Sequence, residues 1–212
     1  MGLTNLIHIL PTEHLIRVAD RRPGLMDWTA VSRRVELPES FIDRHKNRID
    51  WRVISKFHKL SEDFIEKFKD YVSWNYISKY QQLSESFIEK HANKIDWKEI
   101  AAHQNLSEEF IEKYINKIGW TNILCDRKLS EKFIEKHADE VDWNLVSRCQ
   151  ELSEPFIEKY KDRVNWHYIS KYQDLSEKFI EKHKDKVDWY YIFTYQDLTE
   201  KFKEKWRKFL NR

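Results

Sequence analysis

Four histidines recur at a fixed interval and could, by their chemistry, bind a metal ion. They stand 46 residues apart, at His45, His91, His137 and His183. Zinc ligands lie about 2 Å from a single ion, whereas neighbouring helices pack about 8–10 Å apart. If each histidine belongs to a separate repeating unit, their rings are too far apart to share an ion. The spacing therefore predicts no metal site. It predicts a half-buried row in which His alternates with an aromatic residue, at Phe68, Tyr114 and Tyr160.

Two cysteines, Cys125 and Cys149, are the candidates for thiol chemistry. They fall at different positions of neighbouring repeats, which favours two free thiols over a disulfide or a nucleophile. The chain has no glycine-rich phosphate loop and no GxSxG or HExxH motif. The many Glu and Lys residues are typical of solvated helix faces with local ion pairs. We therefore expect no catalytic residue, no metal, no cofactor and no small-molecule substrate, and we predict that the chain is not an enzyme.

A tryptophan that returns every 23 residues sets the positions of all these side chains. Its eight members are Trp28, Trp51, Trp74, Trp97, Trp120, Trp143, Trp166 and Trp189. A leucine keeps the same interval from Leu37 to Leu198, and a phenylalanine from Phe41 to Phe202. Such regularity is typical of a repeat protein, whose units cannot bury their apolar faces alone and must stack on one another.

Residues 60–82 illustrate one repeat. Ser61 is a predicted helix N-cap because two acidic residues follow it in the first turn, and Ser73 is a second predicted cap directly before Trp74. The positions equivalent to Ser73 are Asp50, Asp96, Gly119, Asp142, Asn165 and Asp188, of which only the glycine is a weak cap. Each repeat is therefore predicted to hold two helices, of about ten and about eight residues.

The fold class predicted from this pattern is all-α: an α-solenoid of short two-helix, 23-residue repeats stacked into a superhelix. We expect one repeat domain over residues 1–212. In it, residues 1–36 form a degenerate N-terminal capping repeat, residues 37–197 form seven full repeats, and residues 198–212 form a C-terminal capping helix. The apolar face expected on that last helix consists of Phe202, Trp206, Phe209 and Leu210.

The composition indicates a folded cytoplasmic protein. Aromatic residues make up 15% of the chain, which excludes disorder, and a net charge of +2 argues against a strongly basic nucleic-acid binder. Two cysteines fit a reducing compartment. The first ten residues lack the basic start of a signal peptide, and no apolar run approaches the roughly 20 residues of a membrane span. We therefore expect no membrane partner.

The predicted second helices carry basic and aromatic side chains in register, which we call the second-helix surface. Five places after the tryptophan stand Arg33, Lys56, Lys79, Arg148 and Lys171. Six places after it stand Tyr80 and Tyr172, and two places after it stand Tyr76, Tyr168 and Tyr191. Seven places after it stand Gln81, Gln104, Gln150, Gln173 and Gln196. Across stacked repeats these residues are expected to form parallel basic, aromatic and amide rows.

Two interpretations of the second-helix surface remain open. Basic and aromatic side chains in rows could contact phosphates and stack on bases of a nucleic acid. Alternatively, the tyrosines pack between repeats while Lys and Gln solvate the end of the helix. The residues one and two places after each tryptophan vary most between repeats, as in Tyr190-Tyr191 and Arg52-Val53. Such variation on a constant frame suits a recognition surface, and it equally suits drift at exposed sites.

The repeat consensus is L-S-E-x-F-I-E-K-x-x-x-x-V-D-W-x-x-I-S-x-Y-Q, seen almost whole in residues 152–173 and 175–189. It resembles short tandem repeats of uncharacterised proteins from bacteriophages and large DNA viruses. The resemblance covers nearly the whole chain but carries over no site residue. A viral origin implies a role in binding a host or viral macromolecule. We therefore predict a non-enzymatic binding scaffold for another protein, such as a host factor in the host cytoplasm, with nucleic-acid binding as the alternative.

Overall fold

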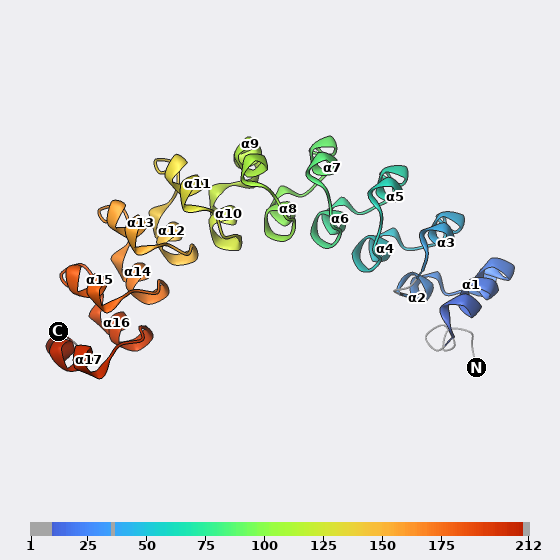
Figure 1. The fold of residues 1–212 in the computed structure, drawn as a ribbon. Helices are drawn as coiled ribbons and strands as arrows, with labels where there is room; N and C mark the ends of the chain where they lie inside the picture. The colour runs from blue at the N-terminus through green and yellow to red at the C-terminus, as the bar shows by residue number, and fades with distance from the viewer. Residues whose placement is uncertain (1–9, 35–36, 210–212) are drawn as a thin grey trace. The chain divides into compact units, whose positions relative to one another are not determined.

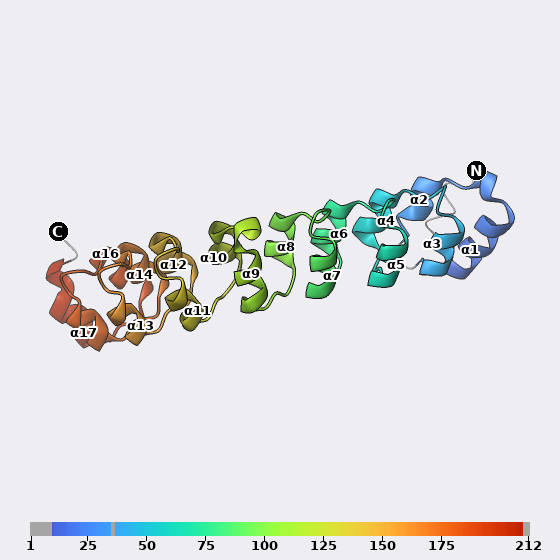
Figure 2. The same ribbon diagram turned by 90° about the horizontal axis from the view of Figure 1, so that it is seen from above.

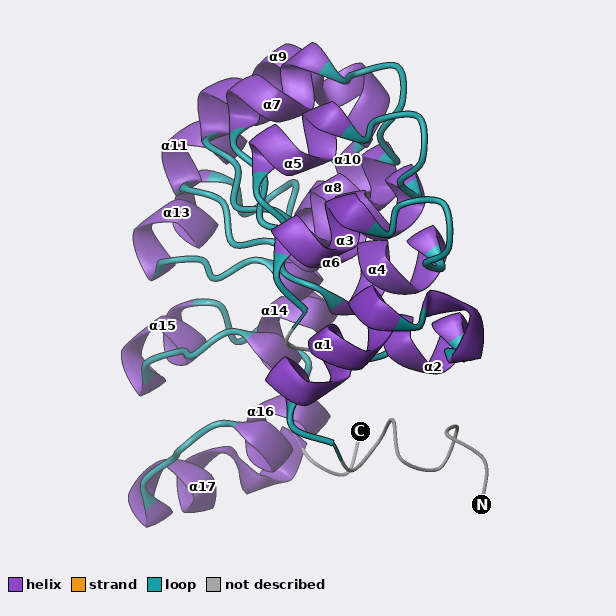
Figure 3. Ribbon diagram, turned by 90° about the vertical axis from the view of Figure 1, so that its right-hand side faces the viewer, coloured by secondary structure: helices purple, strands orange, loops and turns teal. Residues whose placement is uncertain are grey.

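The computed structural model describes residues 10–34 and 37–209, and every regular element in these residues is a helix (Figure 3). The chain divides into two compact units, Met1–Leu106 and Ser107–Arg212. Each full repeat contributes a first helix, which begins at a glutamate, and a second helix, which begins at the recurring tryptophan. The protein is therefore an all-α repeat solenoid, and the predicted fold class is confirmed at that level.

In the first unit, the first helices form one row and the second helices another (Figures 1 and 2). The first helices are α1 (Thr12–Arg21), α3 (Glu39–Arg44), α5 (Glu62–Lys67) and α7 (Glu85–Lys90). The second helices are α2 (Trp28–Ser32), α4 (Trp51–Phe57), α6 (Trp74–Tyr80) and α8 (Trp97–His103). A short 3-10 helix, η2 (Pro23–Leu25), occupies the insertion before the first tryptophan. Neighbouring second helices contact one another along their row.

The second unit repeats this arrangement. Its first helices are α9 (Glu108–Ile118), α11 (Glu131–Lys136), α13 (Glu154–Lys159), α15 (Glu177–Lys182) and α17 (Glu200–Trp206). Its second helices are α10 (Trp120–Asp126), α12 (Trp143–Cys149), α14 (Trp166–Tyr172) and α16 (Trp189–Tyr195). The 3-10 helix η3 (Arg207–Phe209) follows α17. None of the helices in the described ranges of either unit is long and apolar enough to cross a membrane.

Side-chain caps start most of these helices, as the sequence predicts. Ser61 Oγ accepts a hydrogen bond from the Phe64 amide at 3.2 Å, and Asp96 Oδ1 accepts one from the Lys98 amide at 3.1 Å. Ser73 stands at the N-cap position of α6, as predicted, but its side chain makes no capping hydrogen bond. Gly119 also lacks a side-chain cap and holds a φ of +84°, a conformation that suits glycine.

The first helices are shorter than predicted, because the chain leaves the helical conformation after six residues in most repeats. In the repeat of α7 the residue after the helix, His91, has φ −108° and ψ 23°. A separate turn follows, closed by hydrogen bonds from the Lys94 and Ile95 amides to the His91 carbonyl. The expected ten residues are therefore a short helix plus this turn. In α9 the same change of direction occurs at Tyr114, inside one longer helix.

A constant apolar set forms the core of each unit. In the repeat of α7 and α8, Phe87, Ile88 and Ile100 are buried. At the C-terminal end Phe202 and Trp206 are buried, and the Trp206 ring stacks on that of Trp189 with centroids 5.1 Å apart. Two residues of the apolar face expected for the last helix are therefore buried, whereas Leu210 lies outside the described residues.

Candidate binding surface on the second helices

Each recurring tryptophan links its own repeat to the next. Trp74 donates from Nε1 to the Lys69 carbonyl at 2.9 Å, and its ring lies 6.3 Å from that of Phe87 and 4.7 Å from that of His91. The same contacts recur with the Trp143 ring, which is buried, whereas the Trp74 ring keeps a partly exposed edge. These tryptophans therefore belong to the contacts between repeats.

The histidines at 46-residue intervals belong to an ionic ladder on the first helices. His91 Nε2 lies 2.7 Å from Glu66 Oε2, and Lys90 Nζ lies 3.0 Å from the same oxygen. The ion pairs, first with Lys90 and then with Lys69 and His91, lower the pKa of Glu66 to about 2. Glu158 has the equivalent partners in the second unit, and its pKa is likewise lowered to about 2. Among the described residues no three His, Cys, Asp or Glu side chains form a group that could hold a metal.

The glutamines seven places after the tryptophans act as clamps, by which we mean side chains whose hydrogen bonds join neighbouring repeats. They were predicted to form an amide row on the surface or to solvate the end of the helix, and both predictions are wrong. Gln81 Nε2 donates to the carbonyls of Ser55 at 2.9 Å and His58 at 2.7 Å. Its Oε1 accepts a hydrogen bond from the Leu60 amide at 2.9 Å. These partners lie 21–26 residues earlier in the chain. The side-chain amide of Gln81 therefore bonds within the frame, the set of contacts that joins neighbouring repeats, and Gln81 is only 4% exposed.

The small residue four places after the tryptophan is a second clamp. Ser78 Oγ donates to the Trp74 carbonyl at 2.7 Å and accepts a hydrogen bond from the Asp96 amide at 3.0 Å. The equivalent Ser170 joins the carbonyl of Trp166 and the amide of Asp188 in the second unit. No bonding role was predicted for these serines. Their fixed place in the 23-residue period was the available signal for a bonding role.

The prediction that basic and aromatic side chains lie together on the second helices is confirmed for α4 and α6. Lys56 Nζ lies 4.8 Å from the ring centroid of Phe57, 5.8 Å from that of Tyr76 and 5.7 Å from that of Tyr80. Phe57 and Tyr80 are 49% and 46% exposed. An ammonium group over aromatic faces is attracted by the ring quadrupoles. The tyrosine at the sixth place is thus a surface residue, while Tyr76 is half-buried.

The same cluster recurs on α14 and α16. Lys171 Nζ lies 5.0 Å from the ring centroid of Tyr172, 5.1 Å from that of Tyr191 and 5.8 Å from that of Tyr195. The hydrogen bond with Tyr172 raises the pKa of Lys171, with smaller contributions from the other tyrosines. Tyr168 extends the cluster, with its ring centroid 6.2 Å from that of Tyr172.

The remaining basic residues predicted for this surface differ from Lys56 and Lys171. Lys79 Nζ forms an ion pair with Glu99 Oε2 at 3.1 Å, and this bond raises the pKa of Lys79. Arg33 and Arg148 are exposed, and neither forms an ion pair with a described residue. Of the five basic residues, Lys79 is therefore paired with a carboxylate, and the aromatic rings lie beside Lys56 and Lys171.

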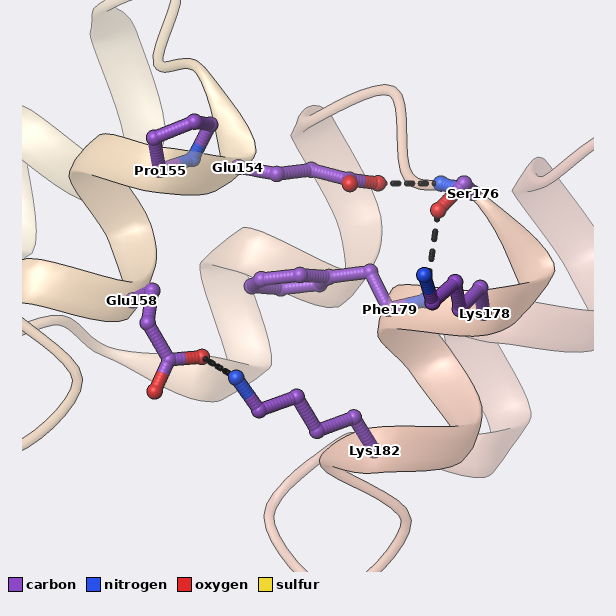
Figure 4. A pocket seen from close by; sticks show the side chains of 7 residues that line it. All are labelled: Glu154, Pro155, Glu158, Ser176, Lys178, Phe179 and Lys182. Atoms are coloured by element: carbon purple, nitrogen blue, oxygen red, sulfur yellow. Dashed lines mark hydrogen bonds and ion pairs between the residues drawn. The ribbon is translucent and has the colours of Figure 1, made fainter.

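A cavity lies on the first helices, away from the basic and aromatic clusters of the second helices. It has a volume of about 300 Å³ and lies between α13 and α15, where Figure 4 shows its seven lining side chains. Its polar groups already bond one another: Glu154 Oε1 accepts from the Ser176 amide at 2.6 Å, and Glu158 pairs with Lys182 at 2.7 Å. Because these contacts recur between other first helices, the cavity is a feature of the frame.

A scan against protein-family models found no match, and searches of curated proteins and of solved structures also found none.

Proposed function

We propose that this protein is a non-enzymatic scaffold that binds another protein through its second-helix surface. The observation that carries the proposal is where apolar side chains are exposed. Seven large hydrophobic side chains of the described residues are exposed, and five of them lie on second helices: Phe57, Tyr80, Tyr172, Tyr190 and Tyr195. Tyrosine supplies large, rigid contact area at low entropic cost and is enriched at interaction hot spots.

The first helices are less suited to this role because their charged groups already bond within the protein. Lys67 pairs with Asp43 at 2.5 Å, and Lys136 pairs with Glu112 at 2.6 Å. A partner bound there would have to compete with these pairs. By contrast, Lys56 and Lys171 have aromatic neighbours and no carboxylate partner among the described residues.

Variation between the repeats supports a surface with specificity. The two places after the tryptophan are Arg52 and Val53 on α4, and Tyr190 and Tyr191 on α16. These residues differ on helices that both begin with the recurring tryptophan after an aspartate cap, so each cluster presents its own chemistry to a partner. If the resemblance to viral repeat proteins extends to origin, the partner is a host factor in the cytoplasm.

Nucleic-acid binding is the second candidate, because unpaired cations lie beside exposed rings in the Lys56 cluster. Two observations favour a protein partner. Carboxylates are mixed into the surface, as in the pair of Lys79 with Glu99, and the whole chain has a net charge of only +2. A groove that follows a phosphate backbone needs a stronger excess of positive charge.

Differential affinity capture tests this proposal. The wild-type protein is compared with a Tyr80→Ser/Tyr172→Ser variant and with a control variant, Leu25→Ser/Tyr71→Ser, which alters two exposed hydrophobic side chains that do not belong to the second helices. We expect a protein that is retained by the wild type and the control but lost from the first variant, with or without nuclease. Equal retention by all three proteins contradicts the proposal. Loss of every captured protein after nuclease treatment supports the nucleic-acid candidate.

A further inference from the structure

A groove lies along α4, between it and α6 in the first unit, and its lining suggests what it binds. Two adjoining cavities form it, with volumes of about 510 and 240 Å³. Both are lined by Lys56 and Phe57. Arg52 and Tyr76 line one end, while Lys59 and Tyr80 line the other. We refer to these six residues as the α4–α6 groove.

We propose that the α4–α6 groove binds an extended acidic peptide segment of a partner protein. This inference rests on the proposed function and specifies the chemistry of the partner at one of its two clusters.

Charge complementarity is the first argument. None of the groove cations Arg52, Lys56 and Lys59 forms an ion pair with a carboxylate of the described residues. The two carboxylates that also line the cavities have other bonds. Asp50 Oδ1 accepts from the Arg52 amide at 2.9 Å, and Glu62 accepts from the Ser84 amide and hydroxyl at 2.5 and 3.0 Å. These donors are uncharged, so both carboxylates keep their charge, and the lining has three cations, two carboxylates and a net positive charge.

The aromatic side chains are the second argument. Phe57 and Tyr80 expose about half of their surface, and their ring centroids lie 4.8 and 5.7 Å from the Lys56 ammonium group. A carboxylate that reaches this ammonium would be flanked by rings that exclude part of the water around it. Partial desolvation strengthens an ion pair relative to one in open solvent. The rings would also cover the apolar stem of a glutamate.

Geometry favours an extended chain. Arg52 and Lys56 are four residues apart on α4, which places them about 6 Å apart along the helix axis. Alternate residues of an extended peptide are about 6.6 Å apart and point to the same face. A segment with an acidic residue at every second position can therefore place successive carboxylates on successive cations.

Fluorescence anisotropy with defined probes tests this inference. The first probe is a labelled peptide of about 12 residues that alternates Glu and Ser, the second has Lys in place of Glu, and the third is an oligothymidylate of similar length. The variant is Arg52→Gln/Lys56→Gln. The control is Lys46→Gln/Arg48→Gln, which removes the same two charge types from the turn after α3 in the same unit. Circular dichroism verifies that each variant is folded.

We expect the Glu peptide to bind the wild type and the control, and to bind the groove variant about tenfold more weakly, because two partly exposed ion pairs are lost. Equal binding of the Glu and Lys peptides, or equal weakening by both variants, overturns the inference. Tighter binding of the oligothymidylate with the same sensitivity to the groove variant assigns the groove to nucleic acid. If no Glu peptide binds while Tyr80→Ser/Tyr172→Ser still loses its captured protein, the inference fails and the proposed function stands.

A second observation, in the other unit, is independent of the groove. Cys125 Sγ on α10 and Cys149 Sγ on α12 lie 3.6 Å apart, although both thiols are free. Sequence reasoning separated them because they stand five and six places after their tryptophans. The structure places these two positions of consecutive repeats side by side, as it does for Lys171 and Tyr195.

We infer that Cys125 and Cys149 form a reversible disulfide when the protein meets a disulfide oxidant such as oxidised glutathione. One cysteine thiolate attacks the oxidant, forming a mixed disulfide and releasing one glutathione thiolate. The second cysteine thiolate attacks the protein sulfur of the mixed disulfide, closing the bond and releasing the second glutathione thiolate. The two protons from the cysteines pass through solvent to the two glutathiones, which carry the two electrons.

The bond would join α10 to α12 where another clamp is missing. Leu124 occupies the serine position of its repeat, so it has no hydroxyl to accept a hydrogen bond from the Asp142 amide. Desolvation and the neighbouring Cys149 thiol raise the pKa of Cys125, so the reaction should accelerate as pH rises. The cross-link removes conformational freedom from the unfolded chain and is expected to raise the melting temperature by about 5 °C.

Incubation with oxidised glutathione followed by alkylation and peptide mass spectrometry tests this inference. We expect one intramolecular link between the peptides that contain Cys125 and Cys149, reversed by dithiothreitol, and a higher melting temperature. Cys125→Ser should instead retain a glutathione adduct on Cys149. Stable glutathione adducts on both cysteines of the wild type, or links between separate chains only, overturn it.

Discussion

Replacing Gln81 by Ala should destabilise the first unit strongly, because this side chain makes three hydrogen bonds between repeats. They join its amide to the carbonyls of Ser55 and His58 and to the amide of Leu60. A net hydrogen bond contributes about 1 kcal/mol, so losing three costs about 3 kcal/mol. Buried groups left without partners would make the loss larger.

The neighbouring glutamine provides a matched control. Gln82 is exposed and makes no hydrogen bond with a described residue, so Gln82→Ala removes the same chemical group at almost no cost. Urea unfolding followed by circular dichroism measures both variants. With a slope of about 2 kcal/mol per molar, Gln81→Ala should lower the midpoint by about 1.5 M. Hydrogen exchange should also show faster exchange of the Leu60 amide in this variant alone.

One outcome would refute the role of Gln81 in joining the repeats. If Gln81→Ala and Gln82→Ala unfold at the same urea concentration and the Leu60 amide keeps its protection, the buried glutamine does not hold the repeats together. Gln81→Glu is a further check, because a carboxylate cannot donate to the two carbonyls and should be nearly as damaging as alanine.

Three further predictions concern other parts of the frame. Trp143→Ala should lower the free energy of unfolding by about 3–5 kcal/mol in urea titrations, because it empties a buried contact with Phe156 and Tyr160; a change below about 1 kcal/mol would contradict its core role. His58 occupies the glutamine position of its repeat and its pKa is lowered by burial, so its contribution to stability is present above pH 6.5 and lost as pH falls through the lowered pKa. His58→Gln should abolish that loss in thermal melts between about pH 6.5 and 5, and an unchanged pH profile would count against it. The pKa of Glu158 is lowered from 4.5 to about 2, so the stability that its ion pairs contribute is present above pH 4.5 and lost as pH falls toward 2. Glu158→Gln should flatten the dependence of stability on pH across that window. An unaltered slope would show that these ion pairs do not stabilise the fold.

The period alone predicts where helices begin, because the information is local. Ser61 and Asp96 stand directly before their helices, and the amides that they cap lie two or three residues away. The length of the first helices was harder to predict, because the break after six residues occurs at a His, Phe or Tyr that is compatible with a helix. In that place the ring packs on the preceding tryptophan, as His91 does on Trp74.

The clamps could not be predicted from local pattern, because their partners are about one repeat away. A polar side chain at a constant place in the period has two explanations, exposure or a repeated buried bond, and only the packing of neighbouring repeats decides between them for Gln81 and Ser78. For the same reason, the proximity of Cys125 and Cys149 on neighbouring repeats could not be predicted. The clusters of Lys56 and Lys171 were accessible from sequence, because their members share fixed places on adjacent second helices.

The binding role itself stays a proposal, and hydrogen–deuterium exchange on the complex with the captured protein tests it most directly. We expect the partner to slow exchange in peptides that cover α4, α6, α14 or α16, and to leave exchange in α5, α7, α13 and α15 unchanged. Protection confined to the first helices would contradict the central claim that the second-helix surface is where this protein binds.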